Sequence, residues 1–127
     1  MPGPATPRYP THRLKEWNTV NNKPSPQLGA ATALVQLLSE NPHLPMLDWT
    51  LPEDGGPLAG VVVNAGVDMR PVVDQYAAVL GGEVREFEFV GSAGRMYSAS
   101  LYVTWRDVRI QVKGICAAAA HTMAVAA

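Results

Sequence analysis

The chain is poor in cysteine, in long apolar runs and in charge, and each shortage excludes a class of protein. Its one cysteine, Cys116, has no partner for an internal disulfide, which suits a reducing compartment. Its apolar runs fall well short of the roughly 20 residues that a bilayer-spanning helix needs. The N-terminus has prolines and charges in place of an apolar leader. We therefore expect a cytoplasmic protein with no membrane contact.

Charge is nearly balanced over the whole chain but unevenly spread along it. The net charge is −1, so no overall field draws the protein to nucleic acid or anionic lipid. Residues 1–23 have a local balance of +3, which leaves −4 for residues 24–127. Five prolines in residues 1–24 disfavour a helix there. We expect this segment to be a flexible basic arm that is solvated rather than bound to a polyanion.

Local signals predict two helices. The first begins at Pro26, a residue suited to the first turn, with Ser25 as its N-cap, and it ends at Asn41. Its apolar residues recur at helical spacing and need a sheet or another helix to cover them. The second helix is predicted to begin after Asp68, a plausible N-cap, and to end at Gly81.

Strand patterns occur in five segments. They are Met46–Leu51, Leu58–Val63, Glu83–Val90, Met96–Trp105 and Val108–Ile115. The element order α-β-β-α-β-β-β predicts an α+β fold: an about five-stranded, mainly antiparallel sheet with two helices on one face. We divide the chain into the arm (residues 1–24), a single domain (residues 25–116) and an alanine-rich C-terminal tail (residues 117–127). The tail either docks through Met123 and Val125 or frays.

Alternation in the last three strands predicts one apolar face and one polar face. The polar face comprises Ser98, Ser100, Tyr102, Thr104, Arg109, Gln111 and Lys113. We expect Glu86 and Glu88 on this same face, paired across strands with Arg109 and Lys113. An aromatic and basic face can stack nucleic-acid bases. With one aromatic side chain and two carboxylates on it, we expect an ordinary exposed face or a protein-binding face instead.

No group of residues has the spacing of a catalytic or ligand-binding motif. His12, His43 and His121 are far apart, and no second cysteine is present to complete a zinc site. The Gly91–Gly94 segment has a serine after its first glycine, but it links two predicted strands, unlike the nucleophile elbow of a hydrolase. We therefore expect no catalytic residue, no metal ligand and no cofactor.

Two resemblances bear on the fold. The strand-helix-strand-strand-strand order of Leu58–Ile115, with Gln-Tyr-Ala-Ala-Val-Leu-Gly-Gly-Glu-Val at residues 75–84, resembles one module of the glyoxalase/dioxygenase-type (vicinal oxygen chelate) fold. That resemblance implies a histidine ligand near Gly60 and a glutamate ligand near Gln111. Neither residue matches, so the metal-dependent chemistry of that family is not implied.

The second resemblance covers Leu28–Ile115. The segment Ser-Glu-Asn-Pro-His-Leu-Pro at residues 39–45 before Trp49, Leu-Gly-Gly at residues 80–82, and Val108–Val112 are similar to a group of small uncharacterised actinomycete proteins. Some members of that group are encoded on mobile elements, which implies an accessory or regulatory role. The resemblance supplies no site residues.

Together these observations favour a non-enzymatic interaction or regulatory module that acts through protein contacts, most simply as a homodimer. Aromatic residues near strand ends, Trp49, Tyr97 and Trp105, supply surface for such contacts. The candidate interaction residues are Trp17, Tyr102, Trp105, Arg106, Arg109 and Lys113. Two alternatives stay open: a glyoxalase-like small-molecule binder or enzyme, and a DNA-binding accessory protein that uses the basic arm.

Overall fold

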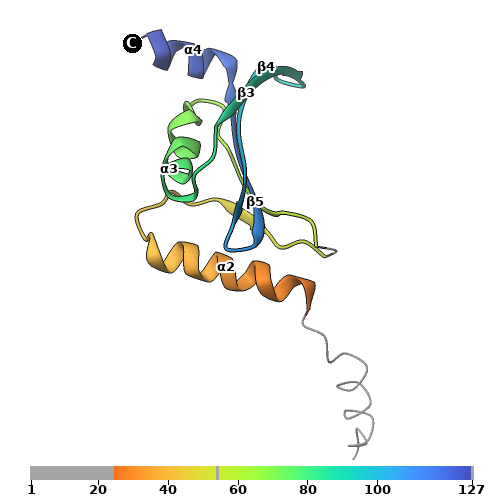
Figure 1. The fold of residues 1–127 in the computed structure, drawn as a ribbon. Helices are drawn as coiled ribbons and strands as arrows, with labels where there is room; N and C mark the ends of the chain where they lie inside the picture. Colours follow the sequence, from red (N-terminus) through yellow and green to blue (C-terminus); the bar gives the residue numbers. More distant parts are fainter. Residues whose placement is uncertain (1–24, 54, 127) are drawn as a thin grey trace, which may run out of the picture.

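The computed structural model describes residues 25–53 and 55–126 (Figure 1). Within them, three helices and one five-stranded sheet form an α+β fold. Three of the four neighbouring strand pairs in the described sheet are antiparallel, which confirms the prediction of a mainly antiparallel sheet. The predicted arm, with Trp17, lies outside the described residues.

The helix α2 (Pro26–Glu40) has the ends that the sequence predicts. At its start the Ser25 hydroxyl accepts a hydrogen bond from the backbone N–H of Gln27. At its end the side-chain amide of Asn41 donates to the carbonyl of Leu37 at 2.9 Å. Both contacts satisfy backbone groups that a helix end leaves without an internal partner.

The second helix, α3 (Arg70–Leu80), begins slightly later than Asp68 indicates, because Met69 is its N-cap residue. The Asp68 carboxylate still accepts the N–H of Arg70 at 3.2 Å. The helix ends at Gly81 as predicted. Gly81 has a φ of 82°, which favours glycine, and its N–H donates to the carbonyl of Ala77.

The sheet has the strand order β1-β2-β5-β4-β3. The bounds are β1 (Asp48–Thr50), β2 (Leu58–Val63), β3 (Arg85–Gly91), β4 (Gly94–Trp105) and β5 (Val108–Ala117). The central pair, β2 with β5, runs parallel. Two-residue turns join β3 to β4 and β4 to β5. In the second turn, Arg106 and Asp107 have φ values of 51° and 65°, the left-handed conformation that glycine usually supplies.

Both predicted helices contribute to a core on one face of the sheet. α3 packs against β4 and β5, and α2 crosses the end of the sheet that holds the β4–β5 turn (Figure 1). We call this side the covered face and the opposite side, over which no described helix lies, the open face. The buried core comprises Ala30, Leu37, Leu58, Met69, Val73, Tyr76, Leu80, Tyr97, Ala99, Leu101, Ile110, Val112, Cys116 and Ala118.

Tyr76 ties α3 to the segment that precedes β1. Its side chain is fully buried, and its hydroxyl donates to the carbonyl of Pro45 at 2.5 Å. The Tyr76 ring also meets the edge of Trp49, with 6.0 Å between ring centroids. Burial raises the pKa of Tyr76 to about 12.

The C-terminal tail forms a third helix, α4 (Ala118–Ala126), directly after β5. Of the two alternatives predicted, docking through Met123 and Val125 is not observed, since both side chains are at least 70% exposed, and the tail is helical rather than frayed. The helix contacts the rest of the fold instead through its first turn, which includes Ala118, Ala120 and His121.

The register of β3 overturns the predicted position of two carboxylates. Glu86 pairs with Ala99 and Glu88 pairs with Tyr97, which places both on the covered face rather than beside Arg109 and Lys113. β3 lies at the edge of the sheet, beyond α3, so its apolar residues have no helix to pack against. Glu86 and Glu88 therefore lie at the polar end of the covered face, and Phe87 and Phe89 lie on the open face.

Candidate functional site

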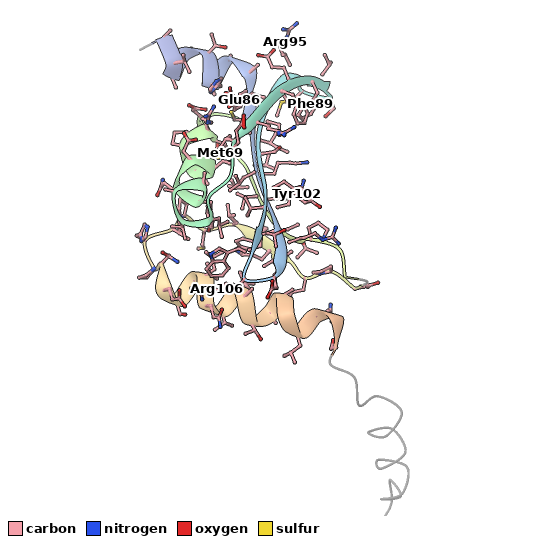
Figure 2. The ribbon with its side chains drawn as sticks, in the orientation of Figure 1. Met69, Glu86, Phe89, Arg95, Tyr102 and Arg106 are labelled. Carbon is pink, nitrogen blue, oxygen red and sulfur yellow. The ribbon has the colours of Figure 1, made fainter. Side chains whose placement is uncertain are left out.

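The open face divides into two halves along the strands. Cross-strand partners place apolar side chains at the end nearer α4 and basic side chains toward the β4–β5 turn. The apolar half comprises Val63, Phe87, Phe89, Met96 and Ile115. The basic half comprises Arg85, Ser100, Tyr102, Arg109, Gln111 and Lys113. Figure 2 shows Phe89 and Tyr102 on the side away from α3, and Glu86 on the side of α3.

Three of the six predicted interaction residues share the basic half. Tyr102 pairs with Gln111, and Lys113 and Arg109 lie two residues to either side of Gln111 on β5. Tyr102 is 56% exposed. The Arg109 guanidinium donates to the carbonyl of Gly55 at 2.7 Å, a contact that leaves its charge uncompensated.

Trp105 and Arg106 do not belong to this surface. Trp105 packs against the core, and the Arg106 guanidinium lies 4.1 Å from the centre of its ring. Arg106 also makes a bidentate contact with Glu40 and a hydrogen bond to Gln36, which together join the β4–β5 turn to α2. The hydrogen bond from Arg106 lowers the pKa of Glu40. The other aromatic residues proposed as surface, Trp49 and Tyr97, are also packed in the fold.

Large apolar side chains are exposed on the apolar half. Phe87 is 51% and Phe89 is 37% exposed, and their rings contact each other with 5.9 Å between centroids. Ser98 lies between Phe87 and Ile115 in one cross-strand row and is fully buried, yet its hydroxyl has no hydrogen-bond partner. Such a hydroxyl is uncommon, because a buried polar group normally finds a partner.

The basic half contains all the unpaired cations of residues 25–53 and 55–126. Six lysine and arginine residues fall in these ranges, and Arg70, Arg95 and Arg106 each form an ion pair with a carboxylate. The other three, Arg85, Arg109 and Lys113, form none, and all three lie on the open face. A shallow hollow of about 350 Å³ lies among Glu83, Arg85, Ser100 and Tyr102.

A polar network on the covered face was missed by the sequence analysis. His121 of α4 stacks on Tyr97 with 3.7 Å between ring centroids, and its Nδ1 lies 2.8 Å from Asp68 Oδ1. Its Nε2 lies 3.5 Å from Glu86 Oε2. Glu86 also accepts a hydrogen bond from the hydroxyl of Tyr97 and forms an ion pair with Arg70 at 2.9 Å. We call these five residues the His121 network.

Hydrogen bonding and burial shift the pKa values of Glu86 and Tyr97. The hydroxyl of Tyr97, followed by the guanidinium of Arg70, lowers the pKa of Glu86. Burial, followed by the Glu86 carboxylate, raises the pKa of Tyr97. Glu86 is therefore ionised, and Tyr97 neutral, throughout the physiological range. A shallow hollow of about 260 Å³ borders the network, lined by Glu86, Phe87, Glu88, Tyr97 and His121.

The geometry of the network suits fastening α4 better than binding a metal. The two carboxylates approach opposite nitrogens of the His121 ring, so they share no point at which an ion could sit. Among the described residues, no three histidine, cysteine or acidic side chains are grouped to hold a metal. The positions implied by the glyoxalase-type resemblance do not converge either: Gly60 pairs with Val112 on the covered face, whereas Gln111 faces the open side.

Replacing His121 with alanine is expected to release α4. The helix has only nine residues and an alanine-rich sequence, so it depends on tertiary contacts to stay folded. We expect amide hydrogen exchange in Ala118–Ala126 to accelerate strongly and the free energy of unfolding to fall by about 1–2 kcal/mol. Met123→Ala, on the exposed side of the same helix, is the matched control and should leave both unchanged. Unaltered exchange in α4 of the His121 variant would contradict this role.

A helix long and apolar enough to cross a bilayer is not found in the described part of the chain. Comparison with known protein families, with characterised proteins and with solved structures gives no match to this chain.

Proposed function

We propose that this protein is a non-enzymatic interaction module that pairs with a second copy of itself through the free edge of β3. The single observation that carries the proposal is that an exposed edge strand bears two exposed phenylalanines. The buried position of the lone thiol, Cys116, suits the cytoplasmic location that we propose with it.

The outer edge of β3 has no strand beside it among the described residues. Gly91 and Gly94 flank a two-residue turn and so form a hydrogen-bonded pair, which directs the backbone groups of every second residue of β3 toward β4. The N–H and C=O groups of Glu86, Glu88 and Val90 therefore point outward. Unpaired groups along an edge are a template for pairing with another strand.

The side chains of β3 favour a partner over water. Every residue of the strand except Gly91 is exposed, and Val90 is 82% exposed. Natural edge strands are usually protected by charged side chains, proline or a bulge. β3 has three charged residues, but they alternate with apolar ones rather than replacing them, and it has no proline.

A second copy fits this edge with two-fold symmetry. Antiparallel pairing about Glu88 places Phe87 of each copy opposite Phe89 of the other, in two cross-strand aromatic pairs on a continuous open face. The two Glu88 side chains meet at the axis on the covered face. Arg95 lies 3.1 Å from Glu88 and offsets their repulsion.

Light scattering on the full chain tests this proposal. We expect a molar mass near twice the 13.6 kDa of one chain at micromolar concentrations. Phe87→Arg should shift the mass to that of the monomer, because it places a charge in each aromatic pair. Val35→Arg introduces the same charged residue at a 67% exposed position of α2 and should leave the dimer intact. A wild-type monomer at every concentration, or equal disruption by Val35→Arg, would contradict the proposal.

A further inference from the structure

The open face differs from the predicted polar face in two respects that both favour a polyanionic partner. Glu86 and Glu88, which would repel phosphate, lie on the covered face and are paired with Arg70 and Arg95. Phe87 and Phe89 join Tyr102 on the open face, so three exposed aromatic rings stand there in place of one.

We infer that the basic half of the open face binds a single-stranded nucleic acid, with its cations on phosphates and Tyr102 stacked on a base. This inference is independent of the proposed function, which concerns the edge of β3 rather than the open face. It does not require the β3 edge to be paired.

The cations are spaced for a chain of phosphates rather than for one phosphate. Lys113 and Arg85 belong to one cross-strand row and lie two strands apart, which is roughly 10 Å by strand spacing. Arg109 lies four residues from Lys113 along β5, roughly 13 Å by strand rise. A single phosphate cannot reach all three residues, whereas successive phosphates of one strand can.

The side chains between the cations suit bases better than an acidic peptide. Arg85 and Lys113 belong to one cross-strand row of the open face. The exposed ring of Tyr102 lies on one side of this row, and Phe87 lies on the other. Ser100, Gln111 and Thr104 surround Tyr102 with hydrogen-bonding groups. A sheet face with exposed rings and flanking cations accommodates unpaired bases, whose faces are inaccessible in a duplex. Two carboxylates belong to this face: Asp48 lies on the edge strand β1, and Glu83 lines the hollow beside Arg85 and Tyr102.

Fluorescence anisotropy with labelled oligothymidylate and oligouridylate tests the inference on the full chain. We expect binding at low salt, with a slope of log affinity against log salt of about −2 for three phosphate contacts. The double variant Arg109→Ala/Lys113→Ala should weaken binding at least about tenfold, and Tyr102→Ala by roughly fivefold or more. Arg95→Ala removes an exposed charge from the covered face and should stay close to wild type.

Several outcomes would overturn the inference. Absence of binding at low salt would do so, as would unchanged binding by the double variant, which would assign the contact to the basic arm. Duplex DNA that binds as tightly as single strands would exclude stacking, and equal competition by polyglutamate would indicate an acidic peptide. If the protein is a dimer but does not bind the oligonucleotide, only this inference is contradicted. If it is a monomer that binds the oligonucleotide, only the proposed dimer is contradicted.

Discussion

Gly114→Val is expected to destabilise the protein more than any other single change considered. Gly114 lies on the covered face of β5, directly beneath the start of α3. An added Cβ would lie 2.9 Å from the Cβ of Met69 and 3.0 Å from its carbonyl oxygen, and 3.1 Å from a methyl group of Val73. Backbone atoms cannot move aside as a flexible side chain can, so α3 must shift away from the sheet. We expect the free energy of unfolding to fall by about 3 kcal/mol.

Chemical denaturation followed by circular dichroism measures this loss. Gly66→Val is the matched control, because an added Cβ at Gly66 meets no atom within 4 Å and its backbone is not in the left-handed region. That variant should stay within about 0.5 kcal/mol of wild type. Equal stability of the two variants would show that α3 does not pack against β5 as described.

Alkaline pH is expected to destabilise the protein, with Tyr76 as a main cause. Burial raises the pKa of Tyr76 to about 12, against 10.0 for an exposed tyrosine. Above pH 10 the unfolded chain loses this proton while the folded chain keeps it, so the unfolded state gains stability with rising pH. The contribution is fully present below pH 10 and is lost as the pH rises to about 12. Two pKa units correspond to about 2–3 kcal/mol.

Tyr76→Phe isolates this effect. At pH 7 it should cost about 1–2 kcal/mol, because the carbonyl of Pro45 loses its hydrogen bond. Between pH 10 and 12 its stability should fall less steeply than that of wild type, with Tyr97 supplying the remaining dependence. Tyr102→Phe removes an exposed hydroxyl and should match wild type at pH 7. If the stability of Tyr76→Phe falls above pH 10 as steeply as that of wild type, Tyr76 is not the cause of the alkaline destabilisation.

The parts of the fold that could be predicted from sequence are those set by neighbours in the chain. The Ser25 cap, the end of α2 at Asn41 and the end of α3 at Gly81 each depend on a few adjacent residues. Alternation in β4 and β5 likewise separated Leu101 and Val112 from Tyr102 and Lys113, because the covered face around these residues is apolar.

The parts that could not be predicted depend on distant contacts. Which face of β3 is covered depends on how far α3 reaches across the sheet, and α3 stops short of this edge. Glu86 and Phe87 therefore occupy the opposite faces from those expected of their polarity. The His121 network requires β5 to extend to Ala117 before α4 turns back toward β4. Its only signal in the sequence is a histidine and a threonine inside an alanine-rich segment.

Amide hydrogen exchange along β3, measured by nuclear magnetic resonance on the full wild-type chain, tests most directly whether this edge is an interface. The N–H groups of Phe87 and Phe89 face β4 and provide an internal reference for a protected strand. If two copies pair, the outward N–H groups of Glu86, Glu88 and Val90 should exchange as slowly as that reference and faster on dilution. Rapid exchange of these three at every concentration, beside a protected Phe87 and Phe89, would show that the edge faces water.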